Sequence, residues 1–210
     1  MHTKGLFPNV LRVHYKQWVD ETKTMIRSQY LDIPLYFNNE PVWFEHSLRN
    51  GVDVVAIRIS LNDFIGFANE CINTIAQEPE LEVRVGMDCF ILGFPENLNL
   101  GVANTPIWKR GSIASEPYQQ EPYLIDSATR VGMSGSPVIA RYTGIFGTKG
   151  SKLTGNEIIG TVVRFVAIYS WRVGNDALGF QLGTAWQSSV LDDILSIKLS
   201  GKHPTEWNGL

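Results

Sequence analysis

Apolar and polar side chains alternate along residues 9–18, where Leu11, Val13 and Tyr15 are separated by polar residues. A period of two is typical of a half-buried β-strand, because successive side chains of a strand point to opposite faces. Short apolar runs between turn-forming residues predict further strands at residues 33–37, 42–44, 52–59, 82–85, 88–95, 108–115, 122–126, 136–142, 158–169 and 178–182. The pattern therefore predicts an all-β protein.

Two segments have helical periodicity instead. Apolar residues recur every three or four positions in residues 64–75, which predicts a short helix or a linker that contains one. Near the C-terminus, one apolar helical face is formed by Val190, Leu191, Ile194 and Leu195, and residues 184–187 have the pattern of a capping box. We therefore expect one helix after the last strand.

The amino-acid composition limits the classes of protein to which this chain can belong. The 210 residues are 44% hydrophobic and 19% charged, so the chain can fill a core and is not intrinsically disordered. The 18 Lys and Arg residues against 21 Asp and Glu residues leave a net charge of −3, which argues against a nucleic-acid partner. The longest apolar stretch, residues 158–171, contains Arg164 and is too short for a bilayer span. With no apolar run of signal-peptide length visible, we expect no membrane association, and a cytoplasmic location is the default.

The two cysteines, Cys71 and Cys89, are too few for a disulfide framework or a Cys-rich zinc site. We expect both thiols to be reduced. The sequence predicts no cofactor and no metal.

The segment around Ser134 carries the clearest chemical signal, with the sequence Gly132-Met133-Ser134-Gly135-Ser136-Pro137. Glycines on both sides of a serine let the backbone bend sharply, and N–H groups in such a bend can converge to bind an oxyanion. The nucleophile elbow of lipases requires G-x-S-x-G followed by a helix. This segment has Ser136 in place of the last glycine and a predicted strand after it, so a hydrolase of the lipase type is disfavoured.

The same segment matches each fixed position of G-x-S-G-[GS]-P, the nucleophile loop of chymotrypsin-like serine peptidases. Other segments resemble motifs of the trypsin-like and Deg-type members of that family, in the same order from Asp53 to the C-terminus. They are residues 52–57 (the strand with the triad aspartate), 86–95 (the G-x-P turn), 111–115 (S-G-x-V-S), 158–162 (V-x-G-I) and 179–182 (G-F-A-I).

This resemblance implies a chymotrypsin-like double β-barrel, with the first barrel incomplete and a helix at the C-terminus. We expect residues 1–80 to form the partial N-terminal barrel and a linker. Residues 81–210 would form the C-terminal barrel with its closing helix. Ser134 would be the nucleophile, and Asp53 would orient a histidine.

The resemblance also implies the residues around the nucleophile. The oxyanion hole would consist of the N–H groups of Gly132, Met133 and Ser134. The specificity pocket would involve Ser127, Ala128 and Gly160. Because Ala128 provides no acid at the base of this pocket, a preference for Arg or Lys is not supported.

The triad histidine has no clear counterpart. The family places it before the aspartate in a T-A-x-H or T-N-x-H sequence, and none of His2, His14, His46 and His203 has that context. His14 precedes Asp53, but it falls on the polar face of its predicted strand, so we favour an exposed histidine over a catalytic base. The chain therefore resembles a family member without about its first two strands. A mis-set start codon, a shortened chain and a degenerate homologue all remain open.

Two functions follow from this resemblance. The first is a trypsin-like serine endopeptidase that uses a His-Asp-Ser triad, with the chain as given truncated before the histidine. The alternative is a catalytically inactive pseudo-protease that binds peptides in the same cleft. Both take a peptide or protein partner, and the unpaired edge of an incomplete barrel predicts self-association.

Overall fold

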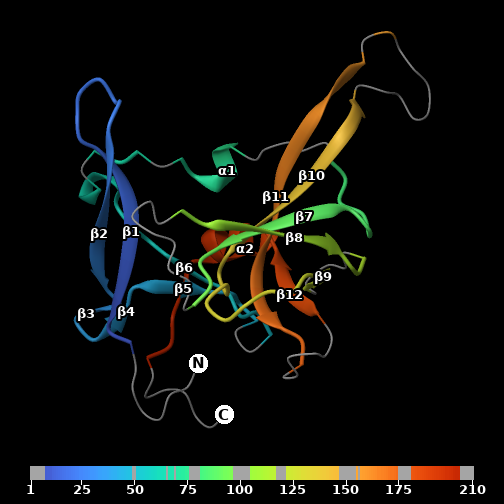
Figure 1. Ribbon diagram of the computed structural model, residues 1–210. Helices are drawn as coiled ribbons and strands as arrows, with labels where there is room; N and C mark the ends of the chain where they lie inside the picture. Colours follow the sequence, from blue (N-terminus) through green and yellow to red (C-terminus); the bar gives the residue numbers. More distant parts are fainter. Residues whose placement is uncertain are drawn as a thin grey trace. The chain divides into compact units, whose positions relative to one another are not determined.

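The computed structural model describes residues 8–48, 51–64, 66–68, 70–75, 81–96, 105–116, 122–146, 155, 157–174 and 181–203. Its elements are mostly β-strands (Figure 1), which confirms the predicted all-β class. The chain divides into two compact units. The first comprises Met1–Glu70, Gly101–Asn104 and Val190–Leu210, and the second comprises Cys71–Leu100 and Thr105–Ser189. Among the described residues, none of the helices combines the length and apolar character of a membrane-spanning helix.

The described part of the first unit contains three small antiparallel sheets. β1 (Val10–Trp18) pairs with β2 (Ile26–Pro34), and β3 (Tyr36–Phe37) pairs with β4 (Glu40–Pro41). The third sheet has the order β13 (Leu199–Ser200), β5 (Trp43–Glu45) and β6 (Val55–Ile57).

The predicted strand at residues 9–18 is confirmed by β1, in which His14 is exposed and Tyr15 is half-buried. Its partner β2 was not predicted over most of its length. Neither face of β2 is uniformly apolar, because Asp32 shares one face with Ile26 and Arg27 shares the other with Leu31. Pairing with β1 along all nine residues, rather than its own periodicity, makes this segment a strand.

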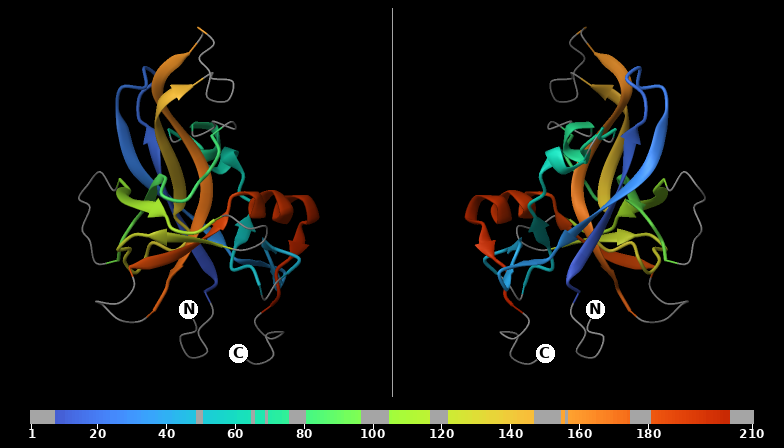
Figure 2. Two further views of the ribbon diagram at one scale, coloured as in Figure 1. Left: turned by 90° about the vertical axis from the view of Figure 1, so that its right-hand side faces the viewer. Right: turned by 90° about the vertical axis from the view of Figure 1, so that its left-hand side faces the viewer.

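The second unit contains a closed antiparallel barrel with the strand order β10-β11-β12-β9-β8-β7, which Figure 2 shows from two sides. Its strands are β7 (Asp88–Gly93), β8 (Ile107–Ile113), β9 (Tyr123–Asp126), β10 (Pro137–Phe146), β11 (Ile158–Arg172) and β12 (Leu182–Gln187). β10 closes the barrel by pairing with β7, where Val138 lies opposite Ile91 and Ala140 lies opposite Cys89. Closure removes the free strand edges over the paired region.

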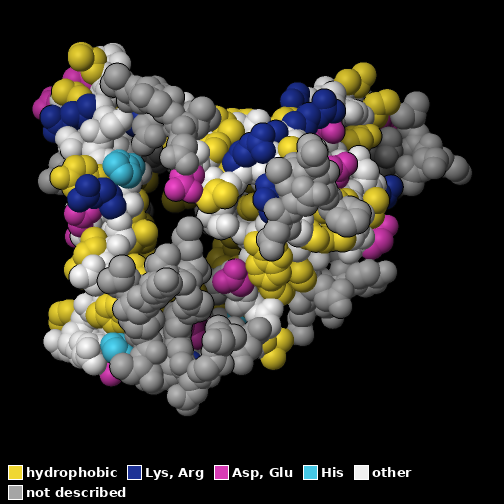
Figure 3. All heavy atoms as spheres, turned by 60° about the horizontal axis from the view of Figure 1, so that its bottom comes forward, with side chains coloured by type: hydrophobic (Ala, Val, Ile, Leu, Met, Phe, Trp, Pro, Cys, Tyr) yellow, Lys and Arg dark blue, Asp and Glu magenta, His cyan; other side chains and the backbone are white. Residues whose placement is uncertain are grey.

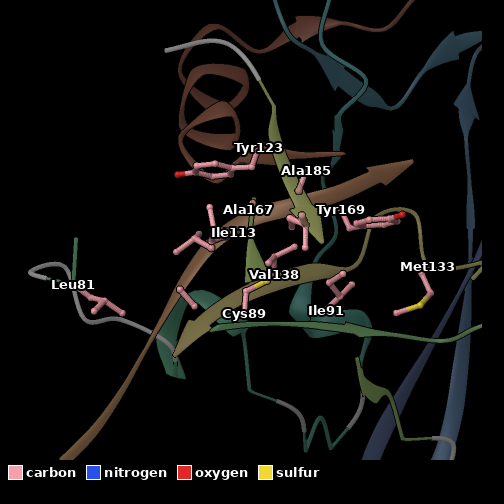
Figure 4. Close-up of a cluster of buried hydrophobic side chains, with 13 residues drawn as sticks. Leu81, Cys89, Ile91, Ile113, Tyr123, Met133, Val138, Ala167, Tyr169 and Ala185 are labelled. Carbon is pink, nitrogen blue, oxygen red and sulfur yellow. The ribbon is translucent and has the colours of Figure 1, made fainter. Parts of the chain in front are cut away.

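Apolar side chains fill the interior of this barrel (Figure 4). Cys89 and Ile91 on β7 are completely buried, whereas Phe90 between them is only half-buried, as expected for a strand with one face on the core. Figure 4 draws Met133 at one side of the cluster and Leu81 at the other. Burial of each large aliphatic side chain contributes roughly 1.5–3 kcal/mol to the free energy of unfolding.

Two local predictions were wrong, and a third was confirmed only in its shorter form. Residues 184–187, predicted as a capping box, belong to β12, because Thr184 pairs with Leu124 of β9; α2 (Ser189–Ile197) begins after them. Of the two alternatives for residues 64–75, the linker that contains a short helix is confirmed: the helix is the single turn α1 (Ile72–Ile75), and a 3-10 turn, η1 (Leu61–Asp63), precedes the segment. Residues 82–85 are not a strand.

The predicted boundary at residue 80 lies among residues 76–80, outside the described residues. The two units instead divide between Glu70 and Cys71, and the chain from Val190 onward, with most of α2, groups with the first unit. Within that unit β13 pairs with β5, and Asp193 of α2 approaches His46. The β13–β5 pairing and the approach of Asp193 to His46 explain why the chain from Val190 onward groups with the first unit.

Large hydrophobic side chains also remain exposed in both units. On the face drawn in Figure 3, hydrophobic side chains (yellow) lie between charged side chains of both signs. Trp108 on β8 is 59% exposed and Ile159 on β11 is 80% exposed. Such positions on a barrel are candidates for contact with partners.

Candidate functional site

Ser134 lies in the turn that precedes β10, within the second unit, and the backbone of this turn is fixed from two sides. Inside the turn, Ser136 N donates to Met133 O at 3.1 Å. On the side of β11, Gly135 N donates to Tyr169 O and Tyr169 N donates to Ser136 O, both at 2.8 Å. The turn is therefore attached to the central part of the barrel and not only to its own neighbours in sequence.

Gly132 adopts a conformation that other residues rarely take, with φ of +90°. A Cβ atom at this position would lie 2.7 Å from Glu96 N and 2.9 Å from Phe94 O. The close approach is held by a hydrogen bond of 2.8 Å from Glu96 N to Val131 O. This gives a steric reason for the first glycine of the motif.

The side chains of the turn point in different directions. Met133 is completely buried in the core of the barrel and anchors the turn. Ser134 is exposed, and no described residue lies within hydrogen-bond distance of its hydroxyl. The structure thus presents the Ser134 hydroxyl to solvent on a rigid support.

Some N–H groups of the turn are hydrogen-bonded to described residues and others are not. Met133 N donates to Arg130 O at 3.3 Å, and the amides of Gly135 and Ser136 are also hydrogen-bonded. Among the described residues, no acceptor is bonded to the amides of Gly132 and Ser134. Of the three amides predicted for the oxyanion hole, two are therefore unengaged, and that of Met133 is occupied.

The predicted pocket residues Ser127 and Ala128 belong to the segment that leads into the turn. Ser127 is buried, its hydroxyl donates to Arg110 O at 3.0 Å and its N–H donates to Gln181 O at 2.8 Å. Ala128 is half-buried. The hydroxyl and the N–H group of Ser127 are thus both hydrogen-bonded within the protein, which holds residues 127 and 128 rigidly. Neither of these two side chains carries a carboxylate.

Tyr169 lies in the interior next to residues 127–129, a position that the sequence did not indicate. Its hydroxyl forms a hydrogen bond with the hydroxyl of Thr129, and both residues are buried. Burial raises the pKa of the Tyr169 phenol above its usual value, so the ring stays neutral in the core. A Cβ atom at Gly183 would overlap the Tyr169 ring, which shows how closely the ring packs there.

Gly160 lies elsewhere on β11. It pairs with Gly144 in the distal part of the β10–β11 hairpin, nine residues before Tyr169. At about 3.3 Å per residue this is roughly 30 Å along the strand. Gly160 does not line a pocket beside the Ser134 turn, and the part of β11 that flanks the turn is around Tyr169.

Asp53 belongs to the first unit and precedes β6. Its side chain is exposed between the buried residues Val52 and Val54. This alternation is that of an extended segment with one face on a core. The pairing of Asp53 with a catalytic histidine stays a prediction.

All four histidines are residues of the first unit. His14 is exposed on β1, with its ring 6.0 Å from that of Tyr30. This agrees with the predicted polar face of the strand. The second unit therefore contains no histidine that could act as a base for Ser134.

His46 is buried, and its one basic nitrogen accepts a hydrogen bond. Nδ1 accepts a hydrogen bond of 3.1 Å from Leu48 N, which places the proton of the neutral ring on Nε2. Nε2 lies 3.6 Å from Oδ2 of Asp193. A neutral imidazole bonded in this way has no unoccupied basic nitrogen, so His46 has a structural role in the first unit.

No metal-binding cluster is found within the part of the chain that the structure describes, since no three His, Cys, Asp or Glu residues lie close enough together. No protein-family model matches the sequence, and a search of the curated proteins found no match.

Proposed function

We propose that this protein is a trypsin-like serine endopeptidase with a chymotrypsin-like double β-barrel whose first barrel is incomplete, and that the second unit carries the nucleophile Ser134. The observation that carries the proposal is the geometry of the Ser134 turn. The turn is fixed to the barrel, its Ser134 side chain is exposed, and the amides of Gly132 and Ser134 bond to no acceptor among the described residues. The closed six-stranded antiparallel barrel of this unit supports the same assignment.

In the proposed reaction, Ser134 Oγ attacks the carbonyl carbon of a peptide bond and a base accepts the hydroxyl proton. The negative charge that develops on the carbonyl oxygen is stabilised by the N–H groups of Gly132 and Ser134. The base then donates its proton to the leaving amine, and water releases the acyl group from Ser134. Asp53 would orient the base, which must come from outside the second unit.

A fluorophosphonate probe tests the nucleophile, because the probe reacts with an activated serine hydroxyl. We expect weak labelling of the chain alone and stronger labelling when imidazole is added as a free base, at Ser134 as located by mass spectrometry. Ser134→Ala should abolish the labelling. Ser136→Ala is the matched control, since Ser136 belongs to the same turn but is buried. Labelling that is no greater than that of the unfolded chain would contradict the proposal.

The lack of a histidine in the T-A-x-H or T-N-x-H context of the family favours a second candidate, peptide binding without cleavage. In that case the surface beside Ser134 would hold an extended peptide, and the serine would be dispensable. Binding of an uncleaved peptide with equal affinity by the wild type and Ser134→Ala, together with no probe labelling in imidazole, would favour this candidate.

A further inference from the structure

The two strands of the β10–β11 hairpin continue past the closed part of the barrel (Figure 1). β10 pairs with β11 over its full length, from Pro137 to Phe146, but it pairs with β7 only from Val138 to Ala140. Among the described strands, none continues the sheet beside residues 141–146 on the β7 side. Such a strand edge offers N–H and C=O groups to an added strand.

The chain before β7 turns away from this edge, which explains why the edge is left open. Gly86 has a φ of +82°, and Met87 N donates to Arg84 O at 3.2 Å. Gly86 N then donates to Ile113 O, and Ile113 N donates to Met87 O, so the turn is attached to β8. Residues 84–87 therefore follow β8 instead of extending β7 along β10.

An open groove of about 910 Å³ lies at this place, entirely within the second unit. It is lined on one side by the turn and the start of β7 and on the other by β10, with the residues Arg84, Val85, Gly86, Met87, Asp88, Phe90, Arg110, Arg141, Tyr142 and Thr143. Tyr142 is 42% exposed and Ile145, further along the same strand, is 47% exposed. The open strand edge and the groove are thus parts of the same surface.

The charge of the lining is positive, with three arginines and one aspartate, whereas the whole chain has a net charge of −3. Arg84 pairs with Glu82, and Arg110 donates to both oxygens of Asp88 at 3.0 Å. Arg141 has no carboxylate partner among the described residues, and its guanidinium lies 5.9 Å from the centre of the Phe90 ring. Arg141 therefore provides a positive charge that no carboxylate of the described residues neutralises.

We infer that this surface binds an extended acidic peptide segment, which adds a strand beside residues 141–146 of β10 and places carboxylates near Arg141 and Arg110. Backbone hydrogen bonds to the strand edge would supply affinity, and the arginines would select acidic side chains. Apolar side chains alternating with the acidic ones would contact Val85 and Phe90. The site is separate from Ser134, because Arg141 lies five residues beyond Ser136, roughly 16 Å along the strand.

A peptide is favoured over a nucleic acid because a strand edge pairs with another peptide backbone. A second copy of this chain is the less favoured occupant. If two copies paired symmetrically through this edge of β10, Arg141 of one copy would face a like charge on the other copy, and the two charges would repel.

Fluorescence anisotropy with a labelled ten-residue peptide of alternating Glu and Val tests the inference. We expect saturable binding that Arg141→Glu weakens by about tenfold, since the substitution replaces an attraction by a repulsion. Arg58→Glu, the same charge change in the first unit, should alter the Kd less than twofold. Ser134→Ala should bind like the wild type, so the result does not depend on the proposed peptidase function.

Two altered peptides distinguish binding by strand addition from binding by charge attraction alone, and the protein is left unchanged. Replacement of Glu by Lys should abolish binding, and N-methylation of alternate residues should weaken it by at least about tenfold, since it removes backbone donors. Equal binding of the methylated peptide, or no effect of Arg141→Glu, would overturn the inference. Tighter binding of a single-stranded oligonucleotide of the same length would also overturn the inference. The same holds if the protein sediments as a dimer and Arg141→Glu abolishes that dimer.

Discussion

The two cysteines illustrate how position changes the chemistry of one residue type. Cys89 is completely buried, and this burial, with a smaller contribution from the charge of Asp88, raises the pKa of its thiol to about 12. Cys71 is exposed. Since the thiolate is the reactive form, only an accessible thiol that ionises near neutral pH reacts readily.

We expect one equivalent of Ellman's reagent to react rapidly with the folded protein at pH 8, at Cys71, while Cys89 reacts only after urea unfolding. Cys71→Ser should remove the rapid reaction and leave the slow one unchanged. Rapid modification of both thiols in native protein would show that the barrel core opens readily.

Gly132 permits a second prediction at the scale of a residue. Gly132→Ala adds a Cβ atom that overlaps Glu96 N and Phe94 O, in addition to the cost of a positive φ. We expect it to lower the free energy of unfolding by about 2–4 kcal/mol, measured by urea denaturation.

Gly135→Ala is the matched control for this change. Gly135 belongs to the same turn with a φ of +85°, but no atom lies within 4 Å of its added Cβ. It should lose only about 1 kcal/mol, the cost of the backbone conformation. Equal losses in the two variants would mean that the close approach to Glu96 is not maintained.

At the scale of an element, the β1–β2 hairpin depends on one carboxylate in its loop. Asp20 accepts hydrogen bonds from the N–H groups of Thr24 and Met25 and from the hydroxyls of Thr22 and Thr24. These donors favour the ionised form, the hydroxyls of Thr22 and Thr24 most, and hold the pKa of Asp20 far below its usual value.

Because the folded pKa is depressed, the stabilising contribution of Asp20 is complete above the pKa of the unfolded chain, about 3.9. It is lost as the pH falls from there through the folded pKa. We expect Asp20→Ala to increase hydrogen exchange at the amides of Thr24 and Met25 at pH 7, with Asp20→Asn intermediate. Unchanged exchange in Asp20→Ala would show that the strands alone hold the loop.

Strands were predicted well where one face of the strand is consistently apolar, as in β1 and β7. They were missed where pairing decides the structure, as in β2. The segment at Thr184 satisfies a local helix-start pattern, but its backbone pairs with β9 on one side and its neighbour Ala185 pairs with β11 on the other. Hydrogen bonds to two strands outweigh a capping signal, which is weak by comparison.

At the scale of the whole molecule, the distribution of histidines predicts low activity. None of the four histidines has the sequence context of the family's catalytic base, His14 is exposed on β1, and Nδ1 of the buried His46 accepts a hydrogen bond from Leu48 N. Without a base at Ser134, only the modest catalysis due to binding and the oxyanion hole would remain.

We therefore expect the 210-residue chain to show little or no cleavage of casein or of fluorogenic peptides, and His14→Ala to leave that level unchanged. Strong activity that His14→Ala abolishes would identify His14 as the base and contradict the assignment of its role from β1. Activity that persists in Ser134→Ala would point to a contaminating peptidase.

The sequence by itself determined the features that depend on local backbone constraints and periodicity. These are the β class, most strands of the barrel in the second unit and the sharp turn at Ser134, because glycine, proline and alternating apolar residues act over a few positions. Only the tertiary structure decided which distant residues meet. The apolar run that forms β11 contains no signal to show that Tyr169, and not Gly160, flanks the Ser134 turn. The register of strand pairing likewise leaves one edge of β10 open beside Arg141, since β7 ends its pairing at Ala140. Register follows from the packing of whole strands on a shared core, which no short segment of sequence encodes alone.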